Sequence, residues 1–152
     1  MRVAFRTPAV KAADSSFAVL RLATLLYAAG LVAHTADHLR RGIDVLTWEV
    51  FWAGNVSTLL GVVAIALVVL RHRLAPYAAV AIGLPIALGV AAVHLLPHWS
   101  ALSDAFPGAH GTGVTPLSYT VVLVEILGAL AMALSGLQTI ATARRAPPVS
   151  ME

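Results

Sequence analysis

The sequence predicts an all-α protein: an integral membrane four-helix bundle that runs up, down, up and down, with both termini in the cytoplasm. Two observations carry this prediction. Hydrophobic residues make up 59% of the 152 residues and charged residues only 11%, whereas a soluble domain carries roughly 25% charged residues. Four apolar stretches are each long enough to span a bilayer, which takes about 20 residues in a helix. We therefore expect a single membrane domain, which excludes a soluble enzyme.

The four spans follow one another with polar connections. We expect helices at about 17–39, 48–70, 74–97 and 116–143. Only residues 71–73 separate the second span from the third, so these two are expected to form a tight antiparallel hairpin. The outer loop 98–115 is long and rich in glycine, and two interpretations of it remain open: a mobile lid or a partly disordered loop. The tail 146–152 is expected to be disordered.

The basic residues predict which side of the membrane each end faces. Eight Arg and Lys residues fall on the side of the two termini, against only Arg40 and Arg41 on the other side. Because Arg and Lys accumulate on the cytoplasmic side, both termini are expected there and loop 98–115 outside. Arginine strongly outnumbers lysine, and alanine and valine abound, which indicates a bacterial genome rich in G and C. The expected location is thus a bacterial inner (plasma) membrane.

Two histidine pairs with helical spacing fall at the outer ends of two spans. His34 and His38 lie near the end of the first span, and His94 and His98 lie near the end of the third. Residues four apart share one face of a helix, and both helices are expected to run outward, so the pairs should reach matching depths. Small residues on the same faces indicate that both pairs point into the bundle.

Two inward-facing histidine pairs predict a transition-metal site, because neutral imidazole binds Zn, Cu and Fe. The chain has no cysteine, which excludes thiolate sites and disfavours soft Cu(I). A hydrolase would use three of the four histidines and leave one position for water. An oxidoreductase would need two metals bridged by carboxylates.

Two carboxylates could serve this site as a general base or by orienting an imidazole. Glu125 is expected about 13 Å inside the fourth span, at a depth where an ionisable group is costly unless partnered. Asp37 is expected beside the first histidine pair. The structural alternative for Glu125 is a hydrogen bond to Ser118, Asn55 or a histidine that fastens the bundle.

Two other functions fit the same sequence. In a b-type haem protein for electron transfer, His34 and His94 would ligate the iron from two helices. In an accessory subunit of a larger membrane complex, or a homo-oligomer, Ala129, Ala133 and Gly136 would pack against a partner. The lipid bilayer is an expected partner, whereas nucleic acid is not, because the basic residues form no run. We rank the metal site first, the accessory role second and haem third.

Overall fold

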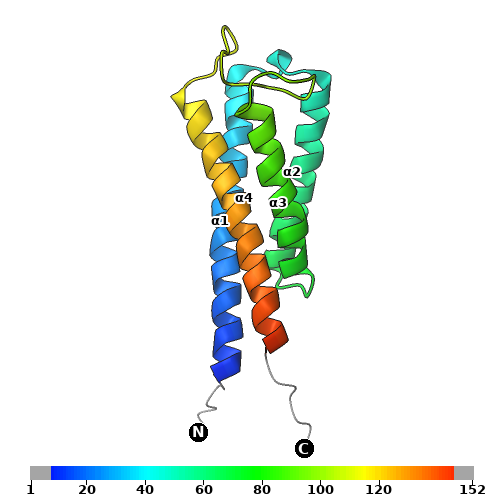
Figure 1. Ribbon diagram of the computed structural model, residues 1–152, viewed down its shortest axis with the longest axis vertical. Helices are drawn as coiled ribbons and strands as arrows, with labels where there is room; N and C mark the ends of the chain where they lie inside the picture. Colours follow the sequence, from blue (N-terminus) through cyan, green and yellow to red (C-terminus); the bar gives the residue numbers. More distant parts are fainter. Residues whose placement is uncertain (1–7, 146–152) are drawn as a thin grey trace, which may run out of the picture.

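The computed structural model describes residues 8–145, and the regular elements in this range are helices (Figure 1). They are α1 (Pro8–Arg41), a short 3-10 helix η1 (Ile43–Val45), α2 (Trp48–Val69), α3 (Ala75–His94) and α4 (Pro116–Arg145). All four α-helices are long and apolar enough to cross a membrane. The prediction of an all-α, multi-pass membrane protein is confirmed. The tail 146–152 lies outside the described residues.

The end of α3 differs from the prediction, with consequences for one predicted ligand. The helix ends at His94 instead of residue 97. Pro97 explains the difference, because proline has no N–H to donate and disfavours a helical conformation in the residue before it. His98 therefore lies beyond the helix and is exposed. The prediction that His98 and His94 share one helix face is wrong.

The backbones of α1 and α4 approach each other more closely than side chains would allow. A Cβ added to Gly30 of α1 would lie 2.6 Å from the Cα of Glu125, and one added to Gly128 of α4 would lie 2.6 Å from the Cα of Tyr27. Because only glycine fits such contacts, these two residues set the position of α1 against α4.

Helix α3 packs on α4 through the same kind of contact. A Cβ on Gly83 would lie 2.8 Å from the carbonyl oxygen of Ala129, and a Cβ on Gly136 would lie 2.7 Å from that of Pro76. Ala129, Ala133 and Gly136 are all buried by this packing. The strip that was predicted to face a partner is therefore used within the chain and is not available to another protein.

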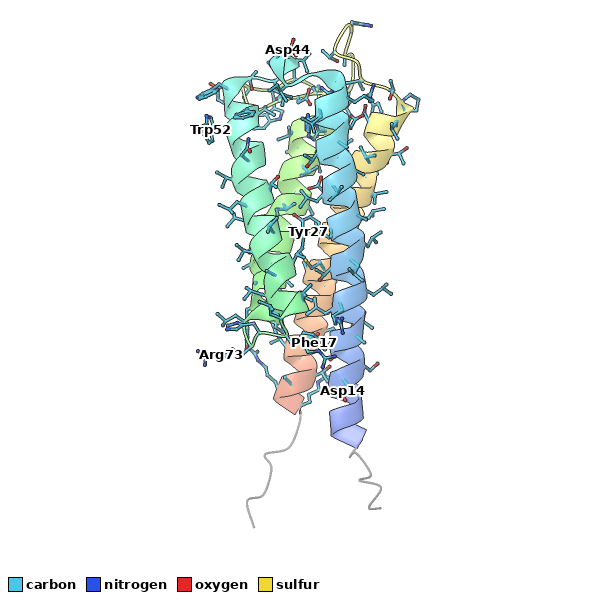
Figure 2. All side chains as sticks on the ribbon, turned by 180° about the vertical axis from the view of Figure 1, so that it is seen from behind. Asp14, Phe17, Tyr27, Asp44, Trp52 and Arg73 are labelled. Carbon is cyan, nitrogen blue, oxygen red and sulfur yellow. The ribbon has the colours of Figure 1, made fainter. Side chains whose placement is uncertain are left out.

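Helix α2 is packed far more loosely than α4. Half of the apolar window of α4 is buried (50%), against 17% for α2. The contact between α1 and α2 includes Tyr27, which lies between the two helices in Figure 2. Its hydroxyl group lies against Gly61 of α2, where an added Cβ would be 2.1 Å from the hydroxyl oxygen. The most extensive contacts between helices are those of α4 with α1 and with α3, and α2 contacts its neighbours less.

We predict that Gly128→Val destabilises the protein. The added side chain would collide with the backbone of α1, and overpacking of this kind costs about 1–3 kcal/mol. The measurement is thermal unfolding in detergent, followed by circular dichroism. Gly54→Ala is the matched control, because a Cβ there meets nothing within 4 Å and alanine is the better helix former. Equal unfolding temperatures for the two variants would contradict the close approach.

Candidate metal centre

Three histidines from two helices come together at one end of the bundle. His34 and His38 of α1 and His94 of α3 each offer a ring nitrogen, and these nitrogens lie within 4.8 Å of one another. The ring centroids of His34 are 4.6 Å from His38 and 4.7 Å from His94. His34 and His94 are buried and His38 is half-buried. Among the residues that the structure describes, this is the one such group of three potential ligands.

The local structure explains the grouping. His34 and His38 are one turn apart on the same face of α1, as their spacing predicts. His94 is the last residue of α3, so its side chain lies at the end of the helix, level with the end of α1. Helix α4 adds a buried carboxylate, that of Glu125, because the glycine contacts place Glu125 against α1.

Glu125 holds the ring of His34. Nδ1 of His34 donates a hydrogen bond to the Glu125 carboxylate, and both residues are buried. The remaining nitrogen, Nε2 of His34, is buried and has no hydrogen-bond partner. In metal sites, a ligating histidine commonly donates its other N–H to a carboxylate, which fixes the tautomer and orients the ring. Of the three structural partners considered for Glu125, the histidine is the one observed.

Asp104, from the long loop, holds His94 in a similar way. Nδ1 of His94 donates to the backbone carbonyl oxygen of Asp104 at 3.1 Å and lies 3.4 Å from its carboxylate. Nδ1 of His38 is 3.9 Å from the same carboxylate oxygen. Arg41 donates two further hydrogen bonds to this carboxylate, at 2.8 and 2.6 Å.

The surroundings of Asp104 favour its ionised form. Burial by itself would raise the pKa of the carboxyl group, but hydrogen bonds from His94 and Arg41, together with the charge of Arg41, hold the pKa well below its ordinary value. A negative charge is therefore fixed beside the histidines. The sequence places Asp104 within the long loop, but no local pattern indicates that it pairs with Arg41.

The loop that carries Asp104 is folded over the end of α3. The backbone N–H groups of Asp104 and Phe106 donate to the carbonyls of Val93 and His94, which would otherwise lack partners at the helix end. Phe106 is buried against the His94 ring, with 4.8 Å between centroids, and lies under the Arg41 guanidinium. The loop thus packs over the end of α3 beside the histidines, and its movement as a lid stays a prediction.

The other predicted site residues are not in the group of three histidines. Asp37 is buried, but its carboxylate pairs with Arg40 at 2.8 Å, which also donates to the carbonyl of Gly113. His98 is exposed beyond α3. Asn55 is exposed as well and donates to the carbonyl four residues earlier in its own helix. The structure therefore brings together three of the four predicted histidines and one of the two predicted carboxylates.

The histidines open onto a cavity. A volume of ≈ 710 Å³ lies between α1, α2 and α3, and His34, His38, His94 and Glu125 line one end of it. An ion held by the histidines would therefore be reachable by a molecule in the cavity.

Comparisons of the chain with protein-family models, with curated proteins and with solved structures find no significant match.

We predict that Asp104→Ala destabilises the fold and loosens the loop. The side chain of Arg41 is fully enclosed (0% exposed), and leaving one member of a buried ion pair without its partner costs roughly 3–5 kcal/mol. The measurements are thermal unfolding in detergent and the rate of proteolysis within loop 98–115. Asp44→Ala is the control, since Asp44 is exposed at the same end of the molecule (Figure 2). If both variants behave alike, Arg41 does not depend on Asp104.

Proposed function

We propose that this protein is a small membrane protein with a mononuclear transition-metal centre formed by His34, His38 and His94. The observation that carries the proposal is the convergence of three ring nitrogens within 4.8 Å, with hydrogen bonds from Nδ1 of two of the rings to Glu125 and Asp104. A buried nitrogen without a hydrogen-bond partner, such as Nε2 of His34, is costly. A bound cation would satisfy it.

Zinc is the ion that this donor set fits best, and Cu(II) and Fe are the others that suit imidazole. Three protein ligands with a fourth position left open is the arrangement of catalytic zinc sites. In such a site the ion lowers the pKa of its bound water to about 7, which is the basis of hydrolysis. Glu125 and Asp104 would fix the rings of His34 and His94, and the cavity would admit the substrate.

Hydrolysis is favoured over the two-metal oxidation considered above. A second ion would need further carboxylates beside the histidines. Asp37 is engaged by Arg40, and Glu49 is exposed at the start of α2. Between residues 8 and 145 only one group of three potential ligands is present, so the residues favour a single ion.

The geometry does not favour haem ligated by His34 and His94. Their rings touch edge to face, with centroids 4.7 Å apart and planes at 80°, which leaves no space for a porphyrin between them. An accessory role has no observation of its own to support it, because the strip expected to bind a partner is buried against α3. We therefore retain the metal centre as the proposed function.

We place the centre near the outer surface of a bacterial inner membrane, with both termini in the cytoplasm and the helices running up, down, up and down. The support is the distribution of basic residues in the sequence, eight on the side of the termini and two on the other. Arg73 and Asp44 mark the two opposite ends of the bundle in Figure 2.

The metal proposal is tested by elemental analysis of the full chain purified in detergent. We predict about one ion per chain in the wild type, and a loss of bound metal in His34→Ala and in His94→Ala, because each variant removes one of three ligands. Glu125→Gln should keep the ligands but weaken binding by roughly tenfold or more, since outer partners of ligating histidines typically contribute 10–100-fold in affinity.

His98→Ala is the matched control for these variants, because it removes a histidine close in sequence but outside the group. It should bind metal as the wild type does. Metal content that is equal in the wild type and in His34→Ala would refute the centre. A Soret absorption band in the purified wild type would favour haem instead.

We predict that a cysteine introduced at His110 reacts with a membrane-impermeant thiol reagent on intact cells. His110 is exposed in the long loop, and the chain has no other cysteine. Ser103 in the same loop is unsuitable, because it is buried and accepts hydrogen bonds from two backbone N–H groups. Labelling that occurs only after lysis would place the histidines on the cytoplasmic side.

A further inference from the structure

The cavity beside the histidines runs lengthwise along the helices. On α3 its lining extends from His94 to Ala81, and on α2 from Val50 to Leu60, which correspond to about 20 and 15 Å of helix axis. Its volume of ≈ 710 Å³ lies within the roughly 300–1,000 Å³ of typical ligand pockets. It is therefore long enough for an extended molecule and far larger than a single ion needs.

The lining is polar at one end and mainly apolar along the rest. The histidines and Glu125 form the polar end. The walls away from it consist largely of aliphatic side chains, including Val56 and Leu60 of α2 and Ile82, Ile86 and Val90 of α3. A wholly polar ligand would lose its hydrogen bonds to water against these walls. The lining instead matches a molecule with a polar head and an alkyl chain.

The cavity is reached from the lipid-facing surface. Three of its lining residues on α2, Trp52, Val56 and Leu60, are 50%, 54% and 46% exposed on a helix long and apolar enough to span a membrane. Lining residues of α3 are exposed as well, among them Ala81 and Pro85. A molecule already dissolved in the bilayer could therefore enter through this exposed surface without passing through water.

We infer that this cavity binds a long-chain membrane lipid, with the alkyl chain between α1, α2 and α3 and an oxygen-bearing head group at the three histidines. This inference rests on the proposed metal centre and names its substrate class: a lipid whose carbonyl or hydroxyl oxygen takes the open position on the ion. The surrounding bilayer is the source of the ligand.

Two glycines allow the cavity to be filled without disturbing the histidines. Gly54 of α2 and Gly89 of α3 both line the cavity, and a Cβ added to either meets nothing within 4 Å. Gly54→Trp and Gly89→Trp would each place an indole side chain in the cavity, one from α2 and one from α3, where the alkyl chain of the lipid is proposed to lie. Ala66→Trp is the matched control, because Ala66 is an exposed residue of α2 that does not line the cavity.

The experiment compares two probes with the same metal-binding head, acetohydroxamate and dodecanohydroxamate. Both are titrated into the full chain, loaded with Co(II) in one detergent, while the visible spectrum of the metal is followed. The short probe should bind the wild type and all three variants equally. The long probe should bind Gly54→Trp and Gly89→Trp about tenfold more weakly or worse, the cost of displacing roughly two methylene groups, and should bind Ala66→Trp as it binds the wild type.

The possible results distinguish failure of the lipid site from failure of the metal centre. If the wild type binds no metal, both are refuted. If it binds metal and the short probe, but filling the cavity leaves the affinity of the long probe unchanged, the metal centre stands and the lipid site is refuted. Because all variants are compared in the same detergent, partitioning of the long probe into micelles affects each of them equally.

Discussion

The contact between the backbones of α1 and α4 at Gly30 and Gly128 is the constraint on which the site depends. Glu125 is about two and a half turns inside a membrane-spanning helix, and an ionisable group there is tolerated only with a partner. The glycines bring its backbone against α1, where His34 is one turn from Gly30. The helix contact therefore provides the carboxylate with a hydrogen bond, and the same bond fixes the orientation of the imidazole. The same helix contact thus determines both the packing of α1 on α4 and the geometry of His34 and Glu125.

The second carboxylate comes from outside the bundle. Asp104 lies on a loop, and a loop carboxylate would normally be free to move. Two N–H groups of the Arg41 guanidinium donate hydrogen bonds to the carboxylate of Asp104, and the ring of His94 donates to its backbone carbonyl. Phe106 packs under both of these residues. These residues form one cluster at the end of the bundle: Arg41 holds the loop through Asp104, and Asp104 in turn orients the ring of His94.

Helix α2 contributes no residue to the group of three histidines and is the least buried of the four helices. The helices that carry His34, Glu125 and His94 are joined by glycine contacts or hydrogen bonds. Helix α2 has Gly61 against Tyr27 and a cap at Thr47, whose hydroxyl donates to the carbonyl of Ala101. Helix α2 also packs against α3, its partner in the hairpin, and the cavity lies between α1, α2 and α3. A less buried wall on the side of α2 suits the proposed binding of a large apolar molecule.

The sequence predicted the parts of the site that depend on periodicity. The four-residue spacing of His34 and His38, and the small residues on their face of the helix, are local signals, and both agree with the structure. The exclusion of His98 has a local signal as well, Pro97, but the helix ends before this residue, at His94. Asp104 and Arg41 could not be predicted, because their pairing depends on the path of a loop with three glycines at positive φ, Gly108, Gly111 and Gly113. Such a path is decided by tertiary contacts that no spacing reveals.

The hydrogen bonds at Nδ1 of His34 and His94 bear on the proposed metal centre, because they decide which ring nitrogens stay free. A neutral imidazole carries one N–H. His34 and His94 use theirs at Nδ1, on Glu125 and on the carbonyl of Asp104, so each has only a lone pair left at Nε2. At His34 this nitrogen is buried and has no hydrogen-bond partner, which is costly for a polar atom. The proposed metal ion would accept its lone pair.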